Sequence, residues 1–359
     1  MSRAANAVDF WRGFALIEIF VNHIPGNFYE HFTHKALSQS DSAELFVFLA
    51  GWSLTHVVGP PDDPRPTPRL IGRLLLRAGK LYAAHMVIVM MAIAMLAVSA
   101  RWLDNPLILE WFNAASVFYD PVDTHVGLVL LTHQLGYFDI LPLYVVLLTA
   151  SPGIALIHRR WPNALLPISF ALWFGALVTE TTFRTWPSEG EWFFNPLCWQ
   201  FDFVLGFLLA RGTGPGGRVR RHLATLRWVA IPLVVVAAVL RVKGIAVDPT
   251  RVPEPHLLFV DAKSFLSPLR LVQFLMLVTA LSGLYPHIAR WAGPLAGALS
   301  LLGRNSLLVF CIGSILSLAG QIGRFAARGG LVFDTVFVLA GIAVLFMAAR
   351  AADWWERAR

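Results

Sequence analysis

Long apolar segments recur along the whole chain and are separated by short polar breaks. Each is close to the about 20 residues that an α-helix needs to cross the hydrocarbon core of a bilayer. We therefore expect an all-α, polytopic integral membrane protein that forms a single domain over residues 1–359. The pattern predicts ten membrane-spanning helices, at residues 8–24, 40–59, 79–99, 137–157, 163–180, 195–210, 228–240, 265–285, 295–320 and 331–349.

The charged breaks predict how these helices are oriented. Arginine and lysine gather in segments 65–80, 158–160 and 211–227, which the positive-inside rule places in the cytoplasm. Segment 286–293 is expected to be a further turn on the inside. The comparatively acidic residues 101–134 are expected outside. With ten spans, this arrangement places both termini in the cytoplasm.

The composition agrees with a membrane protein. With 57% hydrophobic and 14% charged residues and a mean hydropathy of +0.62, the chain has too little polar surface to cover a soluble globule. The net charge of +7 does not indicate nucleic-acid binding, because the basic residues lie in short loops between spans. Cys198 and Cys311 lie inside apolar segments, so we expect core residues rather than a disulfide framework or a zinc site. The first apolar segment contains charged residues and lacks a small-residue cleavage site, so we expect it to be retained.

This first apolar segment carries Arg12 and His23, eleven residues apart. In an α-helix the two side chains fall within about 20° of each other on one face, roughly 16 Å apart along the axis. Polar groups in a membrane segment suggest a functional site. Arg12 is suited to phosphate or diphosphate groups of a cytoplasmic donor, but Asp9, three residues earlier, is equally suited to pair with it.

The outer end of the first helix is expected to face the start of the second. Ser40 or Asp41 is the predicted cap of the second helix, and with Asp41 as cap Glu44 has the capping-box spacing. A carboxylate beside an imidazole makes a general base, so His23 is the candidate base with Glu44, or Asp41, as its partner. Asn22 is a candidate donor to an oxyanion or a substrate. The alternative is an interfacial histidine beside an ordinary helix cap and a plain polar end of a span.

Other charged residues occur within or beside the predicted spans. Asp139, Lys263 and Arg270 lie near outer ends and are candidate substrate-binding residues, whereas Asp202 and Arg304 lie deeper. They form either a substrate channel or a structural ion-pair network. No metal site is predicted, because the histidines of the outer loops lack a metal-ligand spacing; these are His31, His34, His125 and His133.

The sequence resembles the OpgC-type membrane acyltransferases, relatives of the acyltransferase-3 superfamily. The resemblance covers nearly the whole chain and rests on ordered blocks, namely DFWRGFALIEIFVNHIPGN, SDSAELFVFLAGW, GYFDILPLYVVLL, FFNPLCWQFDFVLGF, DAKSFLSPLRLVQFL and LLGRNSLLVFCIGSILSLAG. The Arg-x10-His motif of the superfamily falls on Arg12 and His23. The resemblance implies ten transmembrane helices, His23 as catalytic base and Arg12 as a structural or donor-binding residue. It assigns the acidic partner less directly to Glu44, with Asp41 as the alternative.

The resemblance also implies the reaction. An acyl group, typically succinyl, passes from cytoplasmic acyl-CoA to a periplasmic glucan at the bacterial inner membrane. Acyl-CoA is then a co-substrate, no cofactor is tightly bound, and the partners are membrane lipids and a glycan acceptor, without nucleic acid. The basic segments 65–80 and 211–227 are suited to attract the nucleotide phosphates of the donor. Nothing in the sequence indicates an oligomeric state.

Two other functions fit the sequence. A membrane transporter or exporter of a glycan or lipid, without covalent chemistry, would also use embedded charges. Transport folds often show repeated halves, and no internal repeat is found in this sequence. A structural membrane partner of a glycan synthase is the third possibility, and it predicts that His23 has no chemical role.

Overall fold

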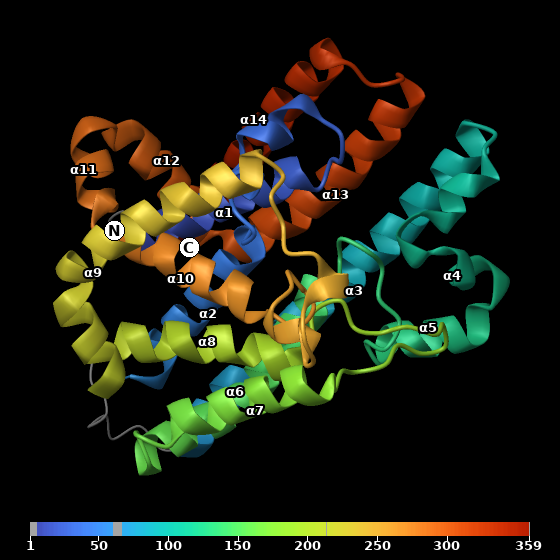
Figure 1. Cartoon of the computed structure of the whole chain (residues 1–359). Coiled ribbons are helices and arrows are strands. Elements are labelled where there is room, and N and C mark those ends of the chain that lie inside the picture. The colour runs from blue at the N-terminus through green and yellow to red at the C-terminus, as the bar shows by residue number, and fades with distance from the viewer. Residues whose placement is uncertain (1–5, 60–66, 213, 359) are drawn as a thin grey trace.

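The computed structural model describes residues 6–59, 67–212 and 214–358. These residues are helical, apart from loops and an isolated bridge between Arg184 and Glu191, so the predicted all-α class is confirmed. Figure 1 shows the helices in chain order. The longer ones are α1 (Ala7–Asn22), α2 (Ser42–Val58), α3 (Thr67–Trp102), α6 (Ile140–Arg160), α7 (Leu165–Thr179), α8 (Pro196–Arg211), α9 (Gly214–Val242), α10 (Pro268–Leu281), α12 (Gly293–Arg304), α13 (Ser306–Ala326) and α14 (Leu331–Ala358).

Short helices form the segments between the long ones. After α1 come η1 (Phe28–Phe32) and η2 (His34–Ala36), and after α3 come η3 (Pro106–Asn113), α4 (Ala115–Tyr119) and α5 (Pro121–Val129). The helices η4 (Pro249–Arg251) and η5 (His256–Leu258) precede α10, and α11 (Leu284–Trp291) follows it.

Within the described residues, five helices are long and apolar enough to cross a membrane: α3, α6, α9, α13 and α14. A sixth is added if α10 and α11, whose axes differ by 49°, together form one bent span. These apolar helices suggest a multi-pass membrane protein. The count of ten spans and the cytoplasmic position of both termini stay predictions.

Several predicted boundaries were wrong. Residues 67–80 and 214–227 were expected in basic loops, but they are the first turns of α3 and α9. Arginine and lysine are good helix formers, so a span can continue as a helix beyond its apolar part. Arg65 lies outside the described residues.

The region from α10 to α13 differs most from the prediction. The expected inside turn 286–293 is helical over most of its length, in α11. The expected span 295–320 consists of α12 and α13, which meet at Asn305, where the backbone is not helical. The Asn305 side chain donates hydrogen bonds to the carbonyl groups of Leu301 and Ala349. A single polar residue in an otherwise apolar segment marks this break, so the hydropathy of the segment does not reveal it.

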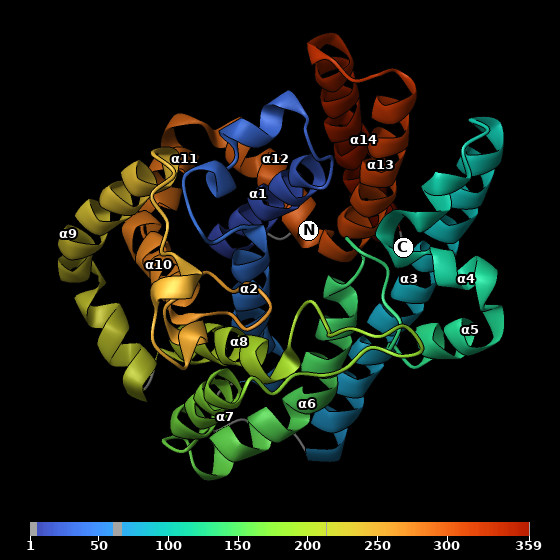
Figure 2. The same ribbon diagram turned by 45° about the vertical axis from the view of Figure 1, so that its right-hand side comes forward.

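Helix α1 is packed between α2, α12 and α13 (Figure 2). Glycines let its backbone approach α12 closely: a Cβ atom at Gly13 would lie 1.9 Å from the carbonyl oxygen of Leu299. A Cβ atom at Gly303 would lie 1.8 Å from the carbonyl oxygen of Asp9. Small residues at helix crossings are typical of membrane bundles, where close van der Waals contact replaces hydrophobic burial. These contacts fix the first half of α1 against α12.

A cavity of about 1210 Å³ lies on one side of α1, between α9 and the rest of the bundle. Its lining is mainly apolar and includes Trp11 and Phe14 of α1. Neither Arg12 nor His23 lines it. The two candidate residues therefore lie on a different face of α1 from the one that borders this cavity.

Candidate active site

Arg12 fastens the first half of α1. Its guanidinium donates hydrogen bonds to the carbonyl oxygen of Leu49 at 3.1 Å and to Ser53 Oγ at 2.5 Å, both in α2. Its Nη1 atom also lies 3.7 Å from Oδ1 of Asp9, so the ion pair between Arg12 and Asp9 that their spacing predicted as one alternative is formed. Arg12 thus joins α1 to α2 through side-chain and backbone contacts.

His23 directly follows the last residue of α1. Its backbone N–H donates to the carbonyl of Ile19 at 2.9 Å, and its own carbonyl accepts a hydrogen bond from Gln321 Nε2 in α13 at 2.6 Å. The imidazole ring makes an edge contact with the ring of Tyr137, at 4.9 Å between centroids. Its Nδ1 atom is buried and has no hydrogen-bond partner among the described residues. Partial burial without a carboxylate partner favours the neutral imidazole, which is the form that can accept a proton.

Asn22 and Asp139 have different surroundings. The amide oxygen of Asn22 accepts a hydrogen bond at 2.9 Å from the Thr33 hydroxyl, which shares its one proton with the carbonyl oxygen of Glu30, and the NH₂ group of Asn22 has no hydrogen-bond partner among the described residues. Asp139 directly precedes α6, but its side chain makes no capping hydrogen bond to that helix. Its carboxylate is therefore not used by the helix that follows it.

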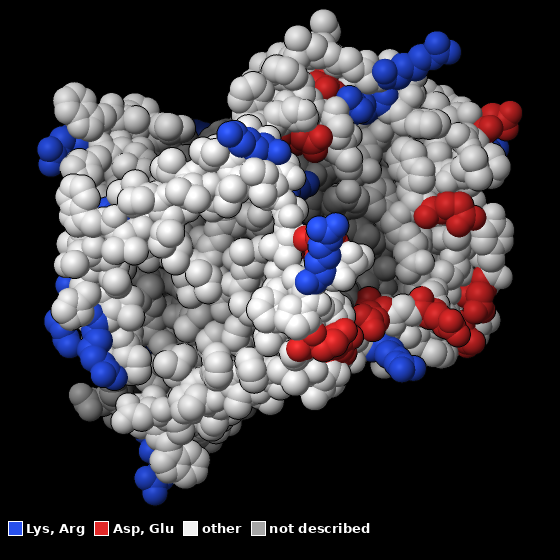
Figure 3. Space-filling view, viewed as in Figure 1, with Lys and Arg blue, Asp and Glu red and all other residues white. Residues whose placement is uncertain are grey.

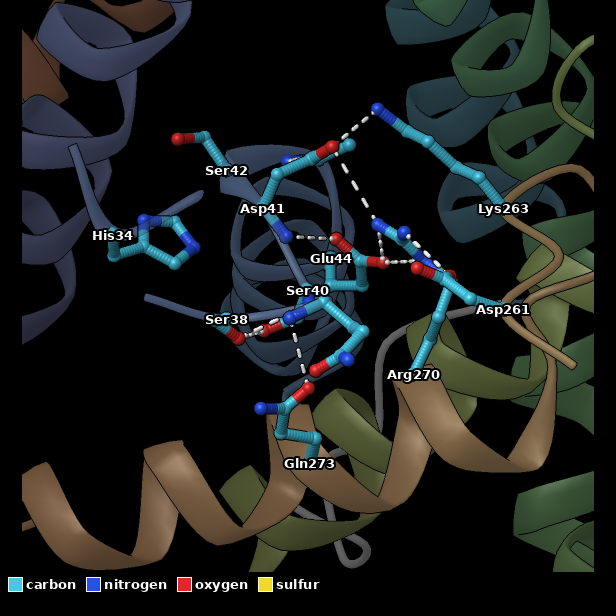
Figure 4. A network of polar contacts seen from close by, with 12 residues as sticks. His34, Ser38, Ser40, Asp41, Ser42, Glu44, Asp261, Lys263, Arg270 and Gln273 are labelled. Atoms are coloured by element: carbon cyan, nitrogen blue, oxygen red, sulfur yellow. Dashed lines mark hydrogen bonds and ion pairs between the residues drawn. The ribbon is translucent and has the colours of Figure 1, made fainter. Parts of the chain in front are cut away.

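The start of α2 forms the predicted capping box. The Asp41 carboxylate accepts a hydrogen bond from the backbone N–H of Ala43 at 2.8 Å, and the Glu44 carboxylate accepts one from the backbone N–H of Asp41 at 2.8 Å. Figure 4 shows both carboxylates beside Arg270 of α10. The choice of Asp41 rather than Ser40 as the cap is thereby decided.

Arg270 is the centre of a network of opposite charges (Figure 4). Its Nε donates to Oε1 of the buried Glu44 at 2.8 Å, and its Nη1 donates to Oδ1 of Asp261 at 3.0 Å. Its Nη2 lies 3.5 Å from Oδ2 of Asp41, which also accepts a hydrogen bond from Lys263 Nζ at 2.5 Å. Two cations thus face three carboxylates, so the network carries no surplus positive charge for an anionic substrate. Of the embedded charges, Lys263 and Arg270 therefore form the structural ion pairs that the sequence offered as one alternative.

These charges determine the ionisation of the Asp41 side chain. Burial alone would raise the pKa of Asp41, but the positive charges of Lys263 and Arg270 outweigh burial and hold that pKa below its usual value. Asp41 therefore stays ionised at neutral pH and continues to bind Lys263.

The expected contact between His23 and a carboxylate is absent in the part of the chain that the structure describes. No hydrogen bond or ion pair joins His23 to Glu44 or Asp41, because Arg270, Lys263 and backbone N–H groups occupy both carboxylates. The structure therefore brings Glu44, Asp41, Lys263 and Arg270 together as one network. It places the His23 imidazole outside that network, against Tyr137.

Sequence reasoning missed a second histidine pair. Glu18 of α1 is buried and accepts three hydrogen bonds: from the His34 backbone N–H at 2.8 Å, from His34 Nδ1 at 2.5 Å and from Ser42 Oγ at 2.9 Å. Burial lowers the pKa of His34, but the hydrogen bond and the charge of Glu18 outweigh it, so the pKa of His34 is raised. The signal was Glu18 itself, because a carboxylate in an apolar helix requires a partner.

The loops that follow α7 and precede α10 also bring together Glu180, Glu254 and His256, whose possible metal-ligand atoms lie within 4.8 Å of one another. The two glutamates are exposed, and exposed acidic groups commonly gather in this way without an ion. Sequence spacing did not predict this group.

Comparison with known proteins identifies the family of this chain. The family model described as OpgC protein matches residues 4–357, which is nearly the whole chain. The chain belongs to the OpgC family. The resemblance of the sequence blocks is thereby confirmed, whereas no curated protein and no solved structure matches.

Membership of the OpgC family suggests succinylation of periplasmic glucans and implies a glucan succinyltransferase with a succinyl donor as co-substrate. It agrees with the apolar helices of a multi-pass membrane protein. In this OpgC protein, Arg12 lies in the second turn of α1 and His23 directly follows the last residue of that helix.

Proposed function

We propose that this OpgC protein is a membrane O-acyltransferase that moves an acyl group, succinyl, from cytoplasmic acyl-CoA to a hydroxyl of a periplasmic glucan. The observation that supports this most is the buried Nδ1 atom of His23, which has no partner in the described chain. A neutral imidazole with an unused nitrogen is suited to accept a proton. In the proposed orientation, with ten spans and both termini in the cytoplasm, His23 lies near the periplasmic face and Arg12 nearer the cytoplasm.

His23 acts as the general base. It takes the proton from the acceptor hydroxyl while the hydroxyl oxygen forms a bond to the thioester carbon. The tetrahedral intermediate then collapses as the carbon–sulfur bond breaks, and the proton passes from His23 to the departing thiolate. An ester on the glucan and free CoA result, so no further reactant is needed.

Asn22 assists at the oxyanion. Because the Thr33 hydroxyl holds the amide oxygen of Asn22, the NH₂ group is the part left to donate to the developing negative charge. This role requires the two neighbours Asn22 and His23 to act on the same intermediate.

Arg12 and the basic helix ends serve the donor. Arg12 already binds Leu49, Ser53 and Asp9, so its proposed role is to hold α1 against α2 along the donor's route. Arginines in the first turns of α3 and α9 attract the nucleotide phosphates at the cytoplasmic side. The roughly 16 Å along α1 from Arg12 to His23 is within reach of an extended pantetheine arm.

The network of charges around Arg270 positions the part of the site that is proposed to receive the acceptor glucan. Glu44 acts through Arg270, by fixing the start of α2 against α10, and does not contact the imidazole. Lys263, 28% of whose side chain is exposed, and Asp139, whose side chain makes no capping hydrogen bond to α6, are the polar groups proposed to meet acceptor hydroxyls.

The test is transfer by the purified protein in lipid vesicles, with labelled succinyl-CoA and a glucan. We expect CoA release and a labelled glucan with the wild type, and a loss of at least about 100-fold with His23→Gln. The control is His31→Gln, an exposed histidine of the same outer segment, which should keep full activity. Full activity of His23→Gln would show that His23 is not the general base. A wild type that moves glucan across the vesicle membrane without releasing CoA would indicate a transporter.

A further inference from the structure

Two loops near His23 carry aromatic residues on strained backbone. Phe112, Asn113 and Tyr137 have φ angles of 60°, 63° and 65°. A positive φ is uncommon for any residue with a side chain and is unusual for bulky ones. Such strain persists only where the surrounding structure enforces it, and it gathers at catalytic sites and ligand clamps.

Hydrogen bonds and ring contacts join the two strained loops to each other. The backbone N–H of Gly136 donates to the carbonyl oxygen of Phe112 at 2.9 Å, and His133 Nε2 donates to the carbonyl oxygen of Asn113 at 3.0 Å. The buried ring of Phe138 contacts the Phe112 ring edge-on, at 6.4 Å between centroids. The two loops therefore hold their aromatic rings in one defined arrangement.

The rings form a path from the imidazole to the surface. The rings of His23 and Tyr137 are 4.9 Å apart and those of Tyr137 and Phe112 are 5.3 Å apart, both in edge contacts. Tyr137 is 37% exposed and Phe112 is half-buried, so both rings present apolar surface next to the candidate base.

This aromatic pair lies between two sides of the molecule. His23 is joined to α13 through Gln321, whereas Phe112 belongs to η3, which follows α3. Figure 3 shows a deep hollow between the surface that carries α13 and α14 and the surface that carries α3, α4 and α5. The imidazole and the aromatic pair are thus supplied by segments on both of these sides.

We infer that Phe112 and Tyr137 form an acceptor subsite, which stacks a pyranose ring of the glucan and presents one of its hydroxyls to His23. A pyranose has an apolar face of C–H groups, and the negative face of an aromatic ring attracts these polarised hydrogens. Asp139, two residues after Tyr137 and without a side-chain capping hydrogen bond to α6, supplies a hydrogen-bond acceptor for the sugar's hydroxyl rim. The inference rests on the proposed function and adds where the sugar binds.

The test separates acceptor binding from donor chemistry. Purified wild type, Phe112→Leu, Tyr137→Leu and Tyr137→Phe are compared in vesicles for the glucan KM and for slow CoA release without glucan. Loss of a stacking ring should raise the glucan KM about tenfold, with acceptor-independent CoA release unchanged. Tyr137→Phe keeps the ring and should keep the wild-type KM. The control is Tyr119→Leu in α4, an exposed aromatic (68%) of the same outer region, which should change neither value.

Two results would overturn the inference while wild-type transfer remains intact. One is an unchanged glucan KM in both leucine variants. The other is an equal loss of acceptor-independent CoA release, which would mean that the rings only hold His23 in place. Phe112→Tyr, which keeps a ring on the strained backbone, should retain the wild-type KM; if Phe112→Leu does not fold, the glucan KM of Tyr137→Leu decides. Absence of transfer by the wild type itself would instead reject the proposed function.

Discussion

Arg270 and the carboxylates around it form a compensated group of buried charges. Three carboxylates surround it, and its side chain is almost inaccessible to solvent. Removing one partner from a buried charge network leaves the others without compensation, which costs far more than an exposed ion pair contributes. Arg270 was predicted as a site residue because its charge lay near the outer end of an apolar segment, and Glu44 because its capping-box position at the start of the second helix made it a candidate partner of His23. The same charges are explained by their mutual pairing, which the sequence could not show, since Glu44 and Arg270 are far apart in the chain.

The substitution Arg270→Met should lower stability strongly. It leaves Glu44, Asp41 and Asp261 with Lys263 as their remaining cation in this network, and we expect a loss of about 3–5 kcal/mol. Thermal unfolding in detergent measures the effect. The matched control is Arg251→Met, whose side chain is 85% exposed beside Asp248, and its effect should stay below about 0.5 kcal/mol. Equal midpoints for both variants would show that the network does not stabilise the fold.

The pair of His34 and Glu18 should make stability depend on pH. The pKa of His34 is raised in the folded protein, with Glu18, Asp41 and Glu44 as the charges that favour protonation. The contribution is therefore fully present below the ordinary pKa of 6.5 and is lost as pH rises through the raised value. The difference in unfolding temperature between wild type and His34→Gln should shrink from about pH 6 to about pH 9. A difference that stays constant or grows over this range would contradict the assignment, and His31→Gln should show no such trend.

At the scale of elements, long apolar helices were predictable because hydropathy and helix length report directly on them. The capping box at Asp41 and Glu44 was also predictable, since its residue types and spacing are local. The break at Asn305 was not, because the side chain there binds a carbonyl group of α14, a long-range contact that no local pattern reveals. The basic first turns of α3 and α9 were predicted as loops because their charged residues were expected to mark the end of the helix.

Close contact between α1 and α12 gives a test at this scale. A Cβ atom at Gly303 would lie 1.8 Å from a carbonyl oxygen of α1, so Gly303→Ala forces the helices apart. We expect a loss of about 1–3 kcal/mol in stability, together with lower transfer activity because α1 carries His23. Gly297→Ala in the same helix meets no atom within 4 Å and should leave both unchanged. Indistinguishable unfolding midpoints for the two variants would mean that the close packing is unimportant.

At the scale of the whole molecule, α1 separates two regions. One face borders the large apolar cavity beside α9, and Arg12 and His23 lie outside that lining. The sequence predicted that Arg12 and His23 share a face of one helix, because helical periodicity fixes their relative directions. Long-range contacts such as those of Tyr137 with His23 and Phe112 depend on folding of distant loops, so no local spacing indicates them.

The central claim is that the protein transfers an acyl group to an extracytoplasmic glucan with His23 as the general base. Mass spectrometry of periplasmic glucans tests it most directly, in cells that carry the wild type, His23→Ala, His31→Ala or no copy, with expression matched by immunoblot. We expect glucans with a succinyl mass increment in the wild type and His31→Ala, and none in the other two. The same increment in His23→Ala as in the wild type would contradict the claim.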